Sequence, residues 1–229
     1  MPATVPSSDV DRHYYRVMTW SLAGLVLILL SAFLVSGENT QLYNKENGMV
    51  EILSAAGYVT VIVALCREAG GAFVRRHAYF LLIPLAMLLR ELDFHTRFTT
   101  INMTKSSFYV SAEVPLVEKL LAVLVLVVLI WLGVAMVRRH AKGFLADLRA
   151  GRAYAVSLAL AGFLTVGSKL IDGLARKLGG FGIVLSEHGQ YAGDIFEEVM
   201  ELGIPLFFLI AVFAYFSMEA GAARRPAES

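Results

Sequence analysis

Ionisable side chains that could perform catalysis follow one apolar segment, in the run Arg90-Glu91-Leu92-Asp93-Phe94-His95. If the helix of that segment continues through the run, Glu91 and His95 stand at positions i and i+4 and lie side by side. A carboxylate beside an imidazole fixes the tautomer of the ring and raises its basicity. We therefore predict that His95, supported by Glu91, is the centre of a site, as a metal ligand or as a proton-transfer group.

Similar residues lie at the ends of the other apolar segments. Glu51 opens one segment, with Ser54 and Tyr58 on the same helical face, and Lys169 and Asp172 close another. Asp194, Glu197 or Glu198, and Glu201 form an acidic stripe that opens the last segment, and His188 lies just before it. A charge inside a bilayer costs about 2.5 kcal/mol or more and normally faces the interior of the helix bundle. We therefore predict one shared polar pocket, formed by Glu51, Arg90, Glu91, His95, Lys169, Asp172, Glu198 and Glu201.

The residue types in this pocket suit a metal-assisted hydrolase or transferase that acts on a lipid-type substrate. Two imidazoles with one or two carboxylates are typical of zinc, so the predicted ligands are His95, His188, Glu198 and Glu201. A carboxylate that does not bind the metal can take a proton from water, and the predicted catalytic residues are His95, Glu91 and Glu51. The predicted substrate-binding residues are Arg90, Lys169 and Asp172. The sequence contains neither H-E-x-x-H nor H-x-x-x-H, so zinc is expected from residue type alone.

Other functions fit the same charges. A layer of acids could bind a cation or relay protons in a transporter, or form the interface of a non-enzymatic partner or assembly protein. His95 and His188 could also be axial haem ligands, although no c-type attachment motif is present. In a purely structural interpretation, the acids stabilise the start of the last helix, and the basic side chains reach lipid phosphates.

The segments that position these residues are membrane spans. Of the 229 residues, 57% are hydrophobic and 17% are charged, whereas soluble domains average about 25% charged. A span needs about 20 residues to cross roughly 30 Å of hydrocarbon. We predict an all-α single domain with six spans at about residues 17–37, 49–66, 78–95, 116–137, 153–172 and 196–218, and with tails at 1–16 and 219–229. The uncharged run 78–89 is too short to span, so the flanking ionisable residues are expected inside the membrane.

Basic residues indicate the orientation of the spans. Alternate loops and tails carry twelve Lys and Arg residues on one side of the predicted membrane and six on the other. Because the richer side faces the cytoplasm, both termini are predicted to be cytoplasmic, in a multi-pass protein of the cell inner membrane. The sequence has no long basic tract, so membrane lipids and a membrane or periplasmic protein are the expected partners, not nucleic acid.

Two resemblances concern the same motifs. The segment Glu46-Asn47-Gly48-Met49-Val50-Glu51, the Arg90–His95 run and the acidic last helix resemble a group of uncharacterised bacterial inner-membrane proteins over about residues 40–215. That resemblance implies a membrane location. The architecture also resembles the ceramidase-like membrane hydrolases, which use a serine, an aspartate and three histidines around zinc. Here the predicted outer side has only two histidines and no paired-histidine motif, so no catalytic residue is assigned from that family.

Overall fold

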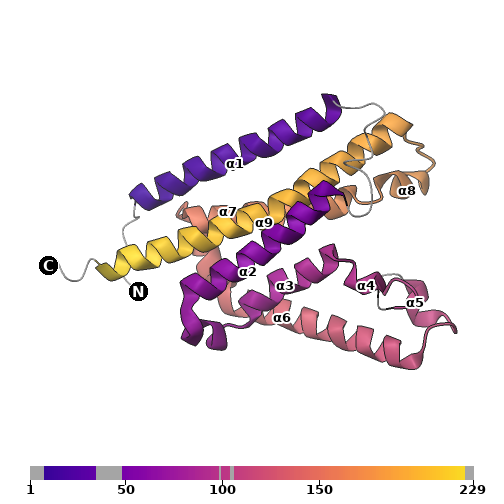
Figure 1. The fold of residues 1–229 in the computed structure, drawn as a ribbon, viewed down its shortest axis with the longest axis horizontal. Helices are drawn as coiled ribbons and strands as arrows, with labels where there is room; N and C mark the ends of the chain where they lie inside the picture. Colours follow the sequence, from indigo (N-terminus) through magenta and orange to yellow (C-terminus); the bar gives the residue numbers. More distant parts are fainter. Residues whose placement is uncertain (1–7, 35–47, 98, 104–105, 225–229) are drawn as a thin grey trace.

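All of the regular structure in the described part of the chain is helical (Figure 1). The structure is a computed structural model that describes residues 8–34, 48–97, 99–103 and 106–224 of the chain. Its helices are α1 (Ser8–Leu34), α2 (Met49–Arg76), α3 (Tyr79–Glu91), α4 (Phe94–Arg97), α5 (Ser106–Val110), α6 (Leu116–Arg149), α7 (Ala153–Ile171), α8 (Leu174–Gly179) and α9 (Glu187–Arg224). The predicted all-α class is confirmed.

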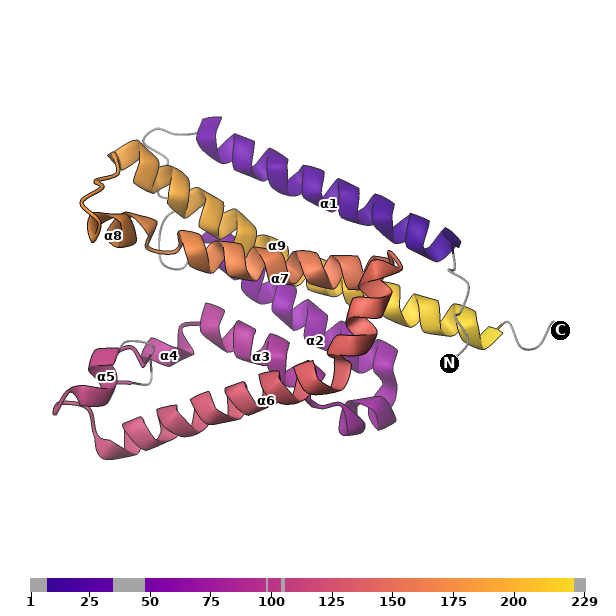
Figure 2. The same ribbon diagram turned by 180° about the vertical axis from the view of Figure 1, so that it is seen from behind.

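Five helices are long and apolar enough to cross a membrane: α1, α2, α6, α7 and α9. The chain is therefore a membrane protein with transmembrane helices. The third predicted span corresponds to α3, which has 13 residues and a length of about 20 Å at 1.5 Å per residue. Helices α1, α2, α3, α6, α7 and α9 run in alternating directions (Figures 1 and 2).

Several helices extend beyond the predicted spans. The first helix begins at Ser8, so part of the predicted 1–16 tail is helical, and residues 35–37 lie outside the described part of the chain. Helix α2 continues ten residues past the predicted 49–66 segment, with a break at Gly70, whose φ is +68°. Helix α9 begins at Glu187, nine residues before the predicted start, and includes residues 219–224 of the predicted tail. These extensions carry helical structure past the apolar runs, because polar residues also support helices outside the hydrocarbon.

The helix of the third predicted span does not continue to His95. It ends at Glu91, because Leu92 leaves helical geometry and Asp93 adopts a φ of +53°. This left-handed conformation is one that aspartate tolerates better than most residues. The predicted i, i+4 arrangement of Glu91 and His95 in one continuous helix is therefore wrong.

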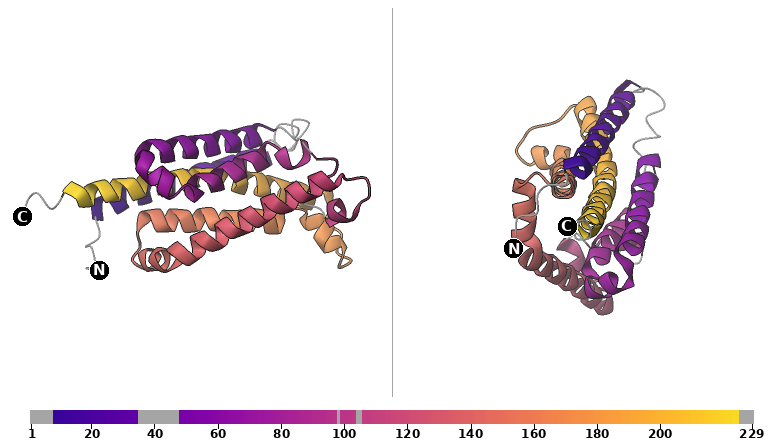
Figure 3. Two further views of the ribbon diagram at one scale, coloured as in Figure 1. Left: turned by 90° about the horizontal axis from the view of Figure 1, so that it is seen from below. Right: turned by 90° about the vertical axis from the view of Figure 1, so that its left-hand side faces the viewer.

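Helices α7 and α9 form the centre of the bundle, and α9 lies between α1 and α2 (Figures 1 and 3). The hydroxyl of Ser157 on α7 donates a hydrogen bond of 2.7 Å to the carbonyl of Phe207 on α9. At Gly203, a β-carbon would lie 2.7 Å from Cδ1 of Leu164 and 3.0 Å from Cδ1 of Leu25. Gly203 therefore lies where side chains of α7 and α1 pack closely against α9, as small residues commonly do between membrane helices.

One end of the bundle, called the basic end below, is rich in arginine: Arg75, Arg76, Arg138, Arg139, Arg149 and Arg152 lie near the α2–α3 and α6–α7 turns. Asp11 of α1 accepts a hydrogen bond of 2.9 Å from the backbone amide of Ala153 and lies 3.9 Å from Arg152. The hydroxyl of Tyr79 lies 2.7 Å from Nε2 of His140. These contacts hold the ends of α1, α3, α6 and α7 together.

Candidate functional site

At the opposite end of the bundle, ionisable residues from four helices lie at one level. They are called the charged layer below and comprise Glu51 on α2, Arg90 and Glu91 on α3, Lys169 and Asp172 at the end of α7, and Glu197, Glu198 and Glu201 on α9. Helices α3 and α7 end at this level, while α2 and α9 enter the bundle there (Figure 2). Antiparallel packing therefore places residues far apart in sequence side by side.

The carboxylate of Glu201 joins three helices. It forms an ion pair with the guanidinium of Arg90 on α3, and its Oε1 lies 3.4 Å from Nζ of Lys169 on α7. The side chain of Glu201 is 12% exposed and that of Arg90 is 34% exposed. Two cations thus neutralise one largely buried carboxylate, as a buried charge requires.

Lys169 also contacts acids at the exposed rim of the layer. Its Nζ donates a hydrogen bond of 3.0 Å to Oδ2 of Asp172 and lies 3.9 Å from Oε1 of Glu197. The hydrogen bond from Lys169 holds the pKa of Asp172, which follows the last residue of α7, below its usual value. Both partners are close to half exposed, so this pair contributes little to stability.

Three buried polar groups beneath the ion pairs have no hydrogen-bond partner within the described part of the chain. They are Oε1 of Glu91 and the hydroxyls of Ser54 and Tyr58. The Glu91 side chain is 4% exposed, and its Oε1 lies 3.8 Å from a nitrogen of Arg90, beyond hydrogen-bonding distance. Tyr58 interacts electrostatically with Glu91, Arg90 and Glu201, so its hydroxyl lies close to the layer. An unpaired buried polar group costs about 1–3 kcal/mol, and such groups are expected at functional sites.

Acids outnumber cations in the charged layer. Glu198 interacts electrostatically with Glu51, Glu91, Glu197 and Glu201, all of which are acidic. The layer as defined contains six acids and two cations, and its ion pairs join those cations, Arg90 and Lys169, to four of the acids. The layer is therefore electrostatically suited to a positively charged group.

The structure brings together seven of the eight residues expected in the pocket: Glu51, Arg90, Glu91, Lys169, Asp172, Glu198 and Glu201. His95 belongs to α4, but its side chain lies outside the described part of the chain. His188 is exposed and precedes Glu198 by ten residues in α9, about 15 Å along the helix axis. The structure therefore does not bring His188 to Glu198 and Glu201.

The site differs from the predicted one in its metal ligands, in one further acid and in an adjoining groove. Among the described residues, no group of three or more His, Cys, Asp or Glu side chains is placed to hold a metal ion. Glu197 lies in the layer although it is not among the residues predicted for the pocket, and an apolar groove beside the layer was not predicted. Gly24 and Gly57 line that groove, but a glycine in a membrane helix more often indicates close packing than a groove.

Comparisons of the chain with protein-family models, with curated proteins and with solved structures give no match. The class of the protein is therefore defined by its own fold and site. It is an all-helical membrane protein in which α3, α7 and α9 are joined by ion pairs at one end of the bundle.

Proposed function

We propose that the protein is a bacterial inner-membrane protein with six spans, in which α3 is the sixth and shortest. The alternating directions of the six helices support this topology (Figure 1). With arginines concentrated at the basic end, the positive-inside rule places that end and both termini in the cytoplasm. The charged layer then opens towards the outside of the membrane.

In this proposal, the charged layer binds the polar part of a lipid-type substrate and performs acid–base chemistry on it, as a hydrolase or transferase. The observation that carries the proposal is the buried carboxylate of Glu91, which has an oxygen without a hydrogen-bond partner beside Arg90 and Tyr58. Groups with an established structural partner can be explained by packing. Glu91, Ser54 and Tyr58 are not explained in that way, and hydrogen-bonding capacity of this kind is what a site offers to a ligand.

Each group has a role that follows from its chemistry. Glu91 takes a proton from the attacking hydroxyl, because a carboxylate in an apolar environment can serve as a general base. Arg90 is held by Glu201 and stabilises the negative charge that develops on the carbonyl or phosphoryl oxygen. The hydroxyls of Ser54 and Tyr58 bind and orient the substrate. A zinc ion held by His95 and carboxylates of the layer would be an alternative means of activating water, which metal analysis of the purified protein tests.

The alternative of transport has less support in the structure. Below the charged layer, Val61, Ala64, Leu65 and Val212 form a buried apolar cluster between α2 and α9. A proton or cation crossing the protein needs a chain of polar groups, and such a chain would have to pass this cluster. An interface with another membrane protein would also use the charged layer, but it does not require the unpaired groups beneath the ion pairs.

Lipid analysis of the reconstituted full chain tests the proposed function. Wild-type protein in nanodiscs of mixed phosphatidylethanolamine and phosphatidylglycerol should convert lipid to lysolipid, free headgroup or a transfer product, followed by mass spectrometry. Glu91→Gln keeps the size of the side chain but removes the base, and a loss of at least 100-fold in rate is expected. Glu113→Gln, in the exposed segment before α6, is the matched control and should leave the rate unchanged. No change in any lipid with the wild-type protein, or equal rates for Glu91→Gln and wild type, would refute the proposal.

A further inference from the structure

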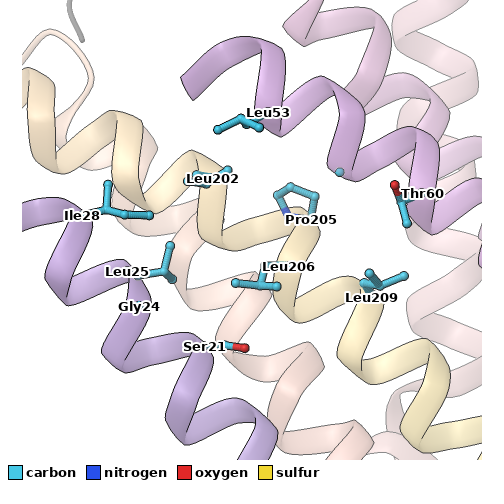
Figure 4. Close-up of a pocket in the computed structure, with 11 residues that line it drawn as sticks. Ser21, Gly24, Leu25, Ile28, Leu53, Thr60, Leu202, Pro205, Leu206 and Leu209 are labelled. Carbon is cyan, nitrogen blue, oxygen red and sulfur yellow. The ribbon is translucent and has the colours of Figure 1, made fainter. Parts of the chain in front are cut away.

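An apolar groove opens between α1, α2 and α9 and has a volume of about 360 Å³ (Figure 4). Leu25 on α1, Leu53 on α2, and Leu202 and Leu209 on α9 are among its lining residues. The volume falls within the range of about 300–1,000 Å³ that is usual for small-molecule sites. The hydroxyl of Thr60 faces the groove but already donates a hydrogen bond of 2.8 Å to the carbonyl of Ala56, so the lining suits hydrocarbon.

Glycines create the shape of this groove. At Gly57, a β-carbon would lie 2.9 Å from two carbons of the Pro205 ring, so the missing side chain lets α2 and α9 come together at its floor. At Gly24 on α1, a β-carbon would meet no atom within 4 Å, because the groove lies in front of it. Gly57 therefore allows α2 and α9 to pack closely, and Gly24 leaves the groove open on the side of α1.

The groove leads to the charged layer along one face of α9. Glu198 precedes Leu202 by four residues, so the two side chains share a face with Glu198 about 6 Å nearer the end of the bundle. From Leu202 to Leu209 the groove extends about 10 Å, a large part of the roughly 15 Å depth of one leaflet. A molecule with its head at Glu198 and its chain in the groove would therefore be oriented like a lipid.

Charge indicates which head fits. Four acids, Glu51, Glu91, Glu197 and Glu201, interact electrostatically with Glu198. On α2, Ser54 and Tyr58 add buried hydroxyls without a hydrogen-bond partner in the described part of the chain. An ammonium group satisfies a carboxylate through charge-assisted hydrogen bonds, whereas an anionic head without an amine would be repelled. Lys169 is 43% exposed at the rim, so a phosphate could reach it by competing with its exposed partner Asp172.

We propose that the groove between α1, α2 and α9 binds one hydrocarbon chain of a lipid whose amine-bearing head lies at Glu198. This lipid class would be the substrate of the proposed function. The inference rests on that function only because both involve the charged layer. A chain gains little by moving from lipid into an apolar groove, since both surroundings are equally apolar. Selectivity among lipids therefore comes from the head group. Occupancy of the groove by the hydrocarbon chain depends on the space in front of Gly24.

Lipid binding to the purified full chain can be measured by native mass spectrometry, without reference to turnover. The probes are dioleoyl phosphatidylethanolamine and dioleoyl phosphatidylglycerol, which carry the same chains. Wild type should bind one phosphatidylethanolamine at least tenfold more tightly than phosphatidylglycerol. Gly24→Leu fills the groove without a backbone clash and should weaken that binding at least tenfold. Gly162→Leu is the matched control, because its β-carbon also meets no atom within 4 Å but lies on α7, and it should bind as wild type does.

A second variant tests the head. Glu198→Gln should bind the two lipids with equal affinity. Equal binding of both lipids by wild type, or unchanged binding by Gly24→Leu, would overturn the inference. A wild-type dimer that Gly24→Leu converts to a monomer would do so as well, because the groove would then hold a second copy of the chain. If wild type binds phosphatidylethanolamine selectively but no lipid is ever converted, the proposed catalysis fails and the groove assignment stands.

Discussion

Replacing Arg90 with methionine removes a charge from the centre of the layer while keeping an unbranched apolar stem. The substitution breaks the ion pair with Glu201 and removes the guanidinium that lies 3.8 Å from Glu91. Glu201 keeps Lys169 at 3.4 Å. The Glu91 carboxylate, with only 4% of its side chain exposed, loses the one cation to which it is ion-paired among the described residues. The main consequence is therefore a buried carboxylate without an ion-pair partner.

The expected destabilisation follows from burial. Removing one member of a buried ion pair typically costs about 3–5 kcal/mol, whereas exposed pairs are worth about 0–1 kcal/mol. Because the Arg90 side chain is one-third exposed and Glu201 retains a cation, we expect the lower limit, about 3 kcal/mol. At about 2–4 °C per kcal/mol for a chain of this size, the Tm should fall by about 6–12 °C.

Thermal unfolding of the full chain in nanodiscs, followed by the fluorescence of its two tryptophans, measures this change. Arg12→Met is the matched control, since its ion pair with Asp9 is exposed, and its stability should change by no more than about 0.5 kcal/mol. Adding Glu91→Gln to Arg90→Met removes the unpaired charge and should recover about 1–3 kcal/mol. An Arg90→Met protein as stable as wild type, or no recovery in the double variant, would show that the layer is not held by its charges.

Three further predictions concern packing, topology and the histidine. Gly57→Ala should lower stability by about 1–3 kcal/mol in the same unfolding assay, because its β-carbon would lie 2.9 Å from the rigid ring of Pro205. Reporters fused after Val114 and after Ser229 should lie in the periplasm and the cytoplasm, and identical locations would refute six spans. His95→Ala should abolish lipid turnover with an unchanged Tm if this residue is functional, and full turnover with unchanged metal content would remove it from the site.

The charged layer could be predicted because membrane burial restricts where ionisable residues can lie. The apolar runs are short, so the charges at their ends are expected to face inward and find partners, as Arg90, Lys169 and Glu201 do. Which groups pair could not be predicted. The pairing depends on the relative depth of α3, α7 and α9, which close packing at positions such as Gly203 determines.

The end of α3 shows a second limit of the sequence reasoning. The pattern Arg90 to His95 is compatible with continuous helix, since none of these residues is glycine or proline. The structure instead turns at Asp93, whose positive φ directs the chain into α4. Local propensity differs little between the two conformations, so packing determines the outcome, and the expected neighbour of Glu91 on its own helix is replaced by groups from α2 and α9.

The groove escaped prediction for a different reason. A glycine such as Gly24 in an apolar helix is common in membrane proteins, where it permits close packing. Only the arrangement of helices shows that no neighbour fills the space in front of Gly24, whereas Pro205 occupies that in front of Gly57. The sequence around Gly24 does not differ from that around Gly57 in any way that predicts this. Only the tertiary structure distinguishes a packing glycine from one that opens a cavity.

Some charges of the layer are expected to stabilise the fold, and others are expected to serve function. Arg90, Glu201 and Lys169 are paired across α3, α9 and α7, so replacing Arg90 is expected to destabilise the fold. Glu91 is buried, and its Oε1 lies 3.8 Å from Arg90 without a hydrogen-bond partner in the described part of the chain, which opposes folding. Glu91→Gln is therefore not expected to lower stability even where it removes activity. In a purely structural salt-bridge network, both substitutions would lower stability, and Glu91→Gln would do so strongly because Glu91 is the more buried residue. A loss of stability on replacing Arg90 but not on replacing Glu91 therefore distinguishes a functional site from a set of charges that only stabilise the bundle.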